Sequence, residues 1–241
     1  MCAKEYPNIY EAKQQIVEVG RRMFLKNYVV SNDGNITCKI DEDTILITPA
    51  RVSKGFMTED MMIKMSLDGK VLSGMSDYVP SSETKVHLRV YKENPEVMAV
   101  IHAHPIMATS FAIAGIDLVN PILTEQLITV GNVFVARYAT PTTEEVPDSI
   151  APYCMDYNAV LLANHGTLTW GDSLMHAYYT LESIEHYATI LMYTSNLIGE
   201  YNTLSCEQIA PLIKIRENLG IKRGGSPPCN SCTGCNSKKT T

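Results

Sequence analysis

The sequence predicts a layered α/β domain with a mixed or largely antiparallel sheet. Three observations lead to this prediction. Helical and strand-like patterns alternate irregularly along the 241 residues, two neighbouring strand patterns are joined by a short turn, and 45% of the residues are hydrophobic. A chain of this length and composition is typical of one globular domain with a short appendage.

The first elements expected are a helix and a hairpin. Residues 8–27 place apolar side chains at helical spacing with charges between them, which is typical of an amphipathic helix. Residues 35–40 and 44–48 are short β-rich runs separated by an acidic turn at 41–43. We therefore expect these two runs to pair as an antiparallel hairpin.

Two further helices are expected on either side of an apolar strand. The Pro-Ser-Ser-Glu sequence at 80–83 begins a predicted helix, with the serines at its start and the glutamate in its first turn, and Pro95 follows its end. Residues 97–104 form a predicted buried strand. Residues 105–115 form a helix that begins with proline and ends with glycine.

The remaining elements of the domain are two strands and up to three helices. Apolar runs at 132–138 and 159–163 predict strands, and the stretch between them, 143–157, is weakly helical because two prolines interrupt it. A long helix is expected at 172–197. A capping box then opens a last helix at 205–220.

The appendage begins at Lys222, where Gly, Ser and Pro predict a flexible joint. We therefore expect a domain at 1–221 and a tail at 222–241. Regular cysteine spacing in the tail suits a thiolate cluster for zinc or iron–sulfur, although a fourth cysteine is missing; the alternative is a disordered tail with redox-active thiols. The tail cysteines are Cys229, Cys232 and Cys235.

Charge and hydropathy argue against several classes of protein. The formal charge is −6 and there is no stripe of Lys and Arg, so we expect no nucleic-acid partner. No apolar run approaches the roughly 20 residues of a membrane span, and the first thirty residues lack a signal-peptide pattern. Seven cysteines, an odd number, are a poor basis for a disulfide framework, so a cytoplasmic protein is expected.

Three histidines are the strongest chemical signal. His102 and His104 lie two residues apart on a predicted strand, so both imidazoles project from the same face. His165 follows another apolar strand. Three neutral imidazoles would bind a divalent ion, most plausibly zinc, with a position left open for catalysis. Alternatively, His102 and His104 lie at the solvent-facing end of the strand and bind only water or a backbone carbonyl.

Five segments together carry a more specific signal. They are Gly34-Asn35-Ile36-Thr37, Ile47-Thr48-Pro49, Pro80-Ser81-Ser82-Glu83, His102-Ala103-His104-Pro105 and Asn164-His165-Gly166-Thr167. The combination resembles the class II, zinc-dependent aldolase/adducin superfamily over roughly residues 8–215. Order and separations are most similar to those of L-fuculose-1-phosphate aldolases.

The resemblance implies a fold, an assembly and a set of site residues. It implies a three-layer α/β/α subunit and a homotetramer with active sites at subunit interfaces. It further implies that His102, His104 and His165 bind one zinc ion per subunit and that Glu83 transfers protons. The family's phosphate pocket corresponds to Gly34, Asn35, Thr48, Arg51, Ser81 and Ser82 in this chain.

Two departures from the family pattern affect the expected substrate. Many relatives have a small hydroxyl residue and then glycine where this chain has Ala50-Arg51, so a hydroxyl is lost and a cation is gained. Arg51 either grips the phosphate or points to solvent. The fuculose-type enzymes also place a tyrosine, their general acid, in the segment corresponding to 120–126. Here Glu125 is the only strong acid–base residue in that segment, and it is either a proton donor or a solvated acid.

The resemblance implies a lyase that reversibly cleaves a deoxy-ketose 1-phosphate, such as L-fuculose 1-phosphate, into dihydroxyacetone phosphate and an aldehyde such as L-lactaldehyde. Glutamate rather than aspartate at Glu83 favours aldol cleavage over the L-ribulose-5-phosphate 4-epimerases. A methylthioribulose-1-phosphate dehydratase is another alternative, and a non-catalytic adducin-head-like binding domain is a third.

Some relatives lie in bacterial microcompartments, so the tail is also a candidate address peptide.

Overall fold

The computed structural model describes residues 5–140 and 143–227. Strands in this part of the chain form one sheet in the order β4-β3-β2-β1-β5-β8-β7-β6. Every neighbouring pair is antiparallel except β6 and β7. The expected mixed, largely antiparallel sheet is therefore confirmed. The strands are β1 (Asn35–Lys39), β2 (Thr44–Ile47), β3 (Ile63–Ser66), β4 (Val71–Ser73), β5 (Ala99–Ala103), β6 (Val135–Ala136), β7 (Ala159–Leu162) and β8 (Gly166–Gly171).

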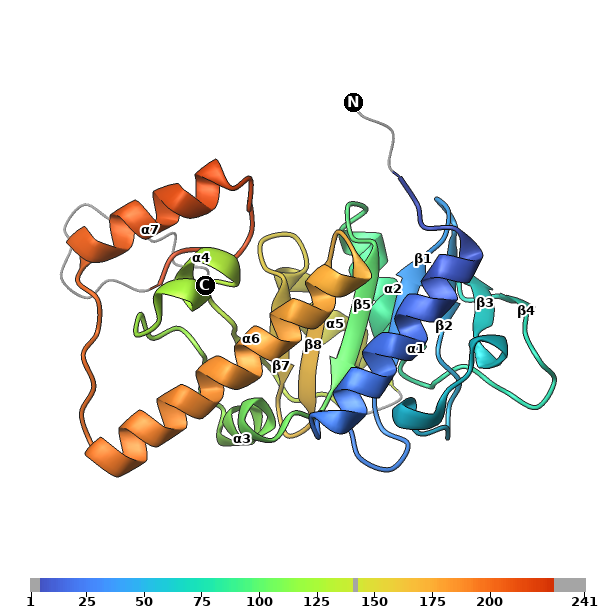
Figure 1. Cartoon of the computed structure of the whole chain (residues 1–241), viewed down its shortest axis with the longest axis horizontal. Helices are drawn as coiled ribbons and strands as arrows, with labels where there is room; N and C mark the ends of the chain where they lie inside the picture. Colours follow the sequence, from blue (N-terminus) through green and yellow to red (C-terminus); the bar gives the residue numbers. More distant parts are fainter. Residues whose placement is uncertain (1–4, 141–142, 228–241) are drawn as a thin grey trace.

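Helices cover both faces of this sheet. In Figure 1, α1 and α6 cross in front of the strands, and α2 and α5 lie behind them. One apolar cluster joins α1 and α6 to β1 and β5, and a second joins α2 and α5 to the other face. This arrangement confirms the three-layer α/β/α fold. The helices are α1 (Ile9–Leu25), α2 (Thr84–Glu93), α3 (Ile106–Ala114), α4 (Thr124–Thr129), α5 (Glu145–Ile150), α6 (Leu174–Tyr193) and α7 (Cys206–Asn218).

Local capping defines the ends of several helices. Asn8 accepts a hydrogen bond from the Glu11 amide at 3.0 Å, and its own amide donates to the Glu11 carboxylate at 3.2 Å, so a capping box begins α1. Ser205 and Gln208 begin α7 in the same way. Gly115 ends α3 with φ 67°, a left-handed conformation that glycine adopts without strain.

The register of β5 places the histidine segment at the centre of the sheet. His102 lies opposite Asn35 of β1 on one side and Leu168 of β8 on the other. Because side chains alternate along a strand, Ile101 and Ala103 face α1 and α6, whereas His102 lies on the opposite face, towards α2. The same alternation brings His102 close to the start of α2.

Several elements differ from the sequence prediction. α2 begins at Thr84 rather than at the serines, and its N-cap residue is Glu83. The Glu83 amide donates a hydrogen bond to the Ser81 hydroxyl at 3.3 Å. The predicted strand at 132–138 contributes only β6 to the sheet. The long helix ends as an α-helix at Tyr193 and continues as a π-helical turn, Thr194–Ile198. β3, β4, β8 and α4 were not predicted.

The start of the predicted tail lies against the domain. The Asn132 amide donates to the Gly224 carbonyl, and the Gly224 amide donates to the Asp156 carbonyl, each at 2.8 Å. The boundary at residue 221 remains a prediction. Cys229, Cys232 and Cys235 lie outside the described residues, so their role also remains a prediction. No helix within residues 5–140 and 143–227 is long and apolar enough to cross a membrane.

Candidate metal centre and substrate pocket

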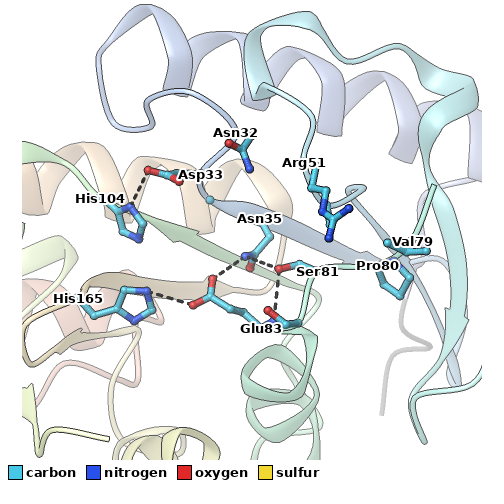
Figure 2. Close-up of a pocket in the computed structure, with 13 residues that line it drawn as sticks. Asn32, Asp33, Asn35, Arg51, Val79, Pro80, Ser81, Glu83, His104 and His165 are labelled. Atoms are coloured by element: carbon cyan, nitrogen blue, oxygen red, sulfur yellow. Dashed lines mark hydrogen bonds and ion pairs between the residues drawn. The ribbon is translucent and has the colours of Figure 1, made fainter. Parts of the chain in front are cut away.

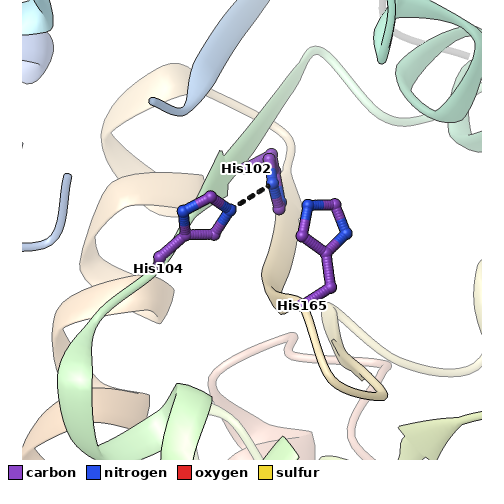
Figure 3. A group of neighbouring side chains, drawn as sticks. All are labelled: His102, His104 and His165. Carbon is purple, nitrogen blue, oxygen red and sulfur yellow. Dashed lines mark hydrogen bonds between the residues drawn. The ribbon is translucent and has the colours of Figure 1, made fainter. Parts of the chain in front are cut away.

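Three histidines from two distant parts of the chain converge at one end of the sheet. His102 lies on β5, His104 follows the end of that strand, and His165 lies on the turn between β7 and β8, where Asn164 takes a left-handed conformation (φ 57°). Figure 3 shows the three rings facing one another. Their candidate ligand nitrogens all lie within 4.8 Å of one another. The structure therefore brings together the three residues that the sequence singled out.

Hydrogen bonds to the rings define which nitrogens are free to bind a metal ion. His102 Nδ1 lies 3.1 Å from the Thr167 carbonyl oxygen, so Nδ1 carries the hydrogen and donates it. His104 Nδ1 lies 3.5 Å from Asp33 Oδ2, a carboxylate that favours the same tautomer. The Nε2 atoms of His102 and His104, 2.9 Å apart, then direct their lone pairs at the same point. A divalent cation satisfies this donor set, so the residues fit a metal ion.

The protonation states of the cluster agree with metal binding. Burial lowers the pKa of His102 to about 3, and burial followed by the charge of His165 lowers the pKa of His104. Both rings are therefore neutral near pH 7, as ligands must be. Burial would raise the pKa of Glu83, but His102, His165 and a hydrogen bond from Asn35 outweigh it and hold the pKa well below its usual range. Glu83 is therefore a carboxylate.

Glu83 connects the histidines to the polar residues of β1 and the segment before α2. Its Oε1 lies 3.1 Å from His165 Nε2, and its Oε2 lies 3.3 Å from His102 Nε2. Asn35 Nδ2 donates to Glu83 Oε2 at 2.9 Å and approaches Ser81 Oγ at 3.3 Å. Glu83 also occupies the N-cap position of α2, where the helix dipole favours negative charge. The carboxylate is therefore held in place by three independent elements.

A pocket of about 530 Å³ opens beside this cluster (Figure 2). One end contains Glu83, His104 and His165. The turn at 32–35 contacts this end through Asp33 and Asn35, and the turn at 50–51 and the segment 79–82 line the rest of the pocket. In Figure 2 the Arg51 side chain extends into the pocket across from Ser81. The predicted residues that line the pocket are Gly34, Asn35, Arg51, Ser81, Ser82, Glu83, His104 and His165.

Two predicted residues lie elsewhere. Thr48 is fully buried, and its hydroxyl accepts a hydrogen bond from the Ile36 amide at 3.1 Å. Thr48 does not line the pocket, and its role in phosphate binding remains a prediction. Glu125 is exposed on α4, where it accepts a hydrogen bond from Thr124 at 2.8 Å, and it does not line the pocket of this chain.

Sequence reasoning missed Asp33 and Asn32, which also line the pocket. Asp33 precedes Gly34, and Asp-Gly is a common turn dipeptide that does not by itself indicate a binding site. Its contact with His104 depends on the pairing of β1 with β5, for which the sequence carries no local signal.

Comparison with known proteins identifies the family. The family model described as the class II aldolase and adducin N-terminal domain matches residues 14–192. The chain belongs to this family. The predicted superfamily membership is thereby confirmed.

Relatives within the class II aldolase family have more than one activity. A 3-oxo-tetronate 4-phosphate decarboxylase from Pectobacterium atrosepticum is 29% identical over 205 residues, which is 83% of this chain and 92% of the relative. An L-fuculose phosphate aldolase from Methanocaldococcus jannaschii is 29% identical over 182 residues, 75% of this chain and 95% of the relative. Among solved structures, an L-fuculose 1-phosphate aldolase matches with a TM-score of 0.76 and 28% identity, covering 87% of this chain and 96% of that one. The prediction of a lyase of the class II aldolase family is confirmed.

A glycine beside the metal centre provides a test of how tightly the cluster is packed. A Cβ atom on Gly166 would overlap the His104 ring and lie 2.6 Å from the Ala103 carbonyl oxygen. We expect Gly166→Ala to displace His104, to weaken metal binding by roughly 10- to 100-fold and to cost about 1–3 kcal/mol of stability. Metal titration and thermal unfolding measure the two effects.

Gly115→Ala is the matched control. The left-handed backbone of Gly115 (φ 67°) also disfavours a side chain, but no atom lies within 4 Å of an added Cβ, so alanine would cause no clash there. This variant should lose about 1–2 kcal/mol through backbone strain and bind metal normally. Unchanged metal binding by Gly166→Ala would show that His104 is not held as described.

Proposed function

We propose that this protein is a zinc-dependent, cytoplasmic lyase that cleaves the C3–C4 bond of a phosphorylated 2-ketose, releasing dihydroxyacetone phosphate and an aldehyde. L-Fuculose 1-phosphate, giving L-lactaldehyde, is the first candidate substrate. One observation carries the proposal: three imidazoles and the Glu83 carboxylate converge at one end of a pocket whose other end presents hydroxyls, backbone turns and Arg51.

His102, His104 and His165 would hold the ion. When bound, a divalent ion supplies Lewis-acid stabilisation for the negative charge that develops on substrate oxygens as the bond breaks. Burial keeps the rings of His102 and His104 uncharged, as metal ligands must be, and the Thr167 carbonyl orients His102. No lysine is required as a covalent electron acceptor.

Glu83 manages the proton at the carbon left by bond cleavage. In aldol cleavage the C4 hydroxyl gives its proton to the Glu83 carboxylate, the C3–C4 bond breaks, and its electron pair stays on C3. Glu83 returns a proton to C3 to complete dihydroxyacetone phosphate, and removes that proton in the synthetic direction. Its contacts with Asn35 and His165 keep the carboxylate oxygens near the metal-binding histidines.

The phosphate occupies the opposite end of the pocket in this proposal. Gly34, Asn35, Ser81 and Ser82 offer short polar side chains and backbone amides without net charge. Arg51 adds the one positive charge of the two pocket-lining turns. Its φ of 62° is a left-handed conformation rare for a residue with a side chain, and it directs the guanidinium towards Ser81. We assign Arg51 to the phosphate.

Decarboxylation is the second candidate reaction, because a decarboxylase is among the relatives with 29% identity. Loss of carbon dioxide from 3-oxo-tetronate 4-phosphate breaks the C1–C2 bond and leaves the electron pair on C2. Protonation of that carbon gives dihydroxyacetone phosphate, the same product as in the aldol reaction. The same histidines, proton donor and phosphate site therefore serve both reactions, and only the departing group differs.

Product analysis by mass spectrometry separates the candidates. Zinc-loaded protein should convert L-fuculose 1-phosphate to dihydroxyacetone phosphate and lactaldehyde. If the protein instead releases dihydroxyacetone phosphate and carbon dioxide from 3-oxo-tetronate 4-phosphate and does not cleave L-fuculose 1-phosphate, it is the decarboxylase. A dehydratase would keep all carbons in one molecule, an epimerase would leave the mass unchanged, and no dihydroxyacetone phosphate from either substrate would contradict the proposal.

We also propose that the protein is a homotetramer with active sites at subunit interfaces. Ile106 and Ile113 of α3, the helix that follows His104, are 61% and 58% exposed, which is costly for aliphatic side chains in a single chain. A partner subunit would cover them and complete the open pocket. Light scattering should give four times the chain mass of 26.7 kDa. A monomeric mass would exclude an interface-completed site.

A further inference from the structure

Lys54 is a buried cation behind the pocket. It lies in a short 3-10 helix, Lys54–Phe56, and only 1% of it is exposed. Its ammonium donates to the Val52 carbonyl at 2.6 Å and to the Asn32 carbonyl at 3.2 Å. Burial lowers its pKa to about 8, with Asp33 partly opposing the shift, so the group is still mostly charged at pH 7.

The two carbonyls lie at the two turns that line the pocket. Asn32 begins the turn through Gly34, and Val52 follows Arg51 directly. Arg51 and Gly34 both have positive φ angles, 62° and 75°. A left-handed conformation is unfavourable for a residue with a side chain and persists only where its surroundings enforce it. The Lys54–Val52 hydrogen bond supplies such a constraint next to Arg51.

The same lysine connects the two ends of the pocket. Asp33, adjacent to the carbonyl that Lys54 binds, lies 3.5 Å from the ring of His104. A chain of contacts thus runs from the Arg51 turn through Lys54 to the turn that faces a metal-binding histidine. The distance between the anion-binding end and the metal centre therefore depends on this side chain.

Packing alone does not require a charge at this position. Burying an ammonium costs several kcal/mol of hydration free energy, and an apolar side chain of similar length would fill the same volume. The charge adds two properties that an apolar side chain lacks: a link between two backbone turns, and a positive potential in a poorly screened interior next to the pocket.

We propose that Lys54 is a positioning residue that ties the 32–34 and 50–52 turns into one anion site and, through its buried charge, sets the affinity of that site for phosphate. This inference rests on the phosphate end assigned under the proposed function. Lys54 does not touch the substrate, and it governs binding of the phosphate group rather than cleavage of the bond.

The test measures inorganic phosphate binding to the zinc-loaded full chain by calorimetry. Lys54→Met keeps the length of the side chain and removes its charge, so we expect the Kd for phosphate to rise about tenfold. Lys54→Arg, which keeps the charge, should restore affinity to within about threefold of wild type. With an active substrate, Lys54→Met should raise KM by a similar factor and change kcat less than about threefold.

Met57→Ala is the matched control for packing. Met57 is 5% exposed and packs with Lys54 beneath Gly20 of α1, but it carries no charge. Its phosphate Kd should stay within about twofold of wild type. Wild-type phosphate affinity in folded Lys54→Met, or an equal loss in Met57→Ala, would overturn the proposal.

A second measurement needs no variant and applies even if Lys54→Met does not fold. Saturating phosphate should slow amide hydrogen exchange in 32–34 and 50–52 together, because Lys54 joins the two turns. Protection of one turn alone would contradict the proposal. Both phosphate experiments are independent of turnover, so failure of the proposed reaction would leave them interpretable.

Discussion

His102→Ala should yield a folded protein with no bound metal and with kcat/KM reduced by roughly a thousandfold or more. The ring is 2% exposed and lies within reach of both His104 Nε2 and Glu83, so it is the central member of the cluster. Two imidazoles leave a divalent ion underbound, and loss of several kcal/mol of charge stabilisation corresponds to this rate reduction. Elemental analysis and steady-state kinetics measure the two effects.

His186→Ala is the control for this variant. His186 is an exposed residue of α6 outside the described pocket, so its replacement should leave metal content and turnover unchanged. Full turnover by His102→Ala at trace metal would rule out the metal assignment.

Glu83→Gln should retain the metal and lose about 10²- to 10⁴-fold in kcat. Glutamine preserves the shape of the side chain and a hydrogen-bonding oxygen, but it cannot exchange a proton with the substrate carbon. Because this proton step is common to aldol cleavage and decarboxylation, the loss is expected with either substrate. Glu42→Gln, in the exposed turn between β1 and β2, is the matched control and should behave as wild type.

A metal content of about one per chain in Glu83→Gln, together with a nearly unchanged KM, would support a role in proton transfer. Wild-type turnover would assign that role to another residue. Loss of the metal would instead make Glu83 a ligand or a structural support of the histidines.

The elements predicted correctly from the sequence carry their signals locally. The capping box of Ser205 and Gln208, the glycine that ends α3 and the apolar run of β5 each depend on residues within a few positions of one another. The pair of His102, on β5, and His104, just after the strand, is another local signal, because the common direction of the two side chains follows from strand geometry alone. His165 was found through its place after an apolar strand and through the family resemblance.

The elements that were missed depend on contacts between distant segments. β8 begins and ends with glycine and alternates threonine with large apolar residues, and it is a central strand because β5 and β7 pair with it on either side. β3 and β4 are short strands at one edge of the sheet, and α4 has six residues. None of these three elements is long enough to produce a clear periodic pattern in the sequence.

In the candidate site, too, the features that the sequence did not predict depend on contacts between distant segments. Glu83 and Asn35 are 48 residues apart in sequence and 2.9 Å apart in space, a contact that only the packing of α2 against β1 creates. The burial of Thr48 depends likewise on a distant contact, because its hydroxyl has a backbone partner 12 residues away, in the neighbouring strand. Lys54 carries no sequence signal at all: a lysine is normally a surface residue, and its burial becomes visible only once the two turns are placed.

Anomalous scattering at the zinc absorption edge, from crystals grown without added metal, tests the central claim most directly. We expect one peak per chain, at the point faced by the Nε2 atoms of His102 and His104 and by the ring of His165. No peak there, with these rings hydrogen-bonded only to one another and to Glu83, would contradict it.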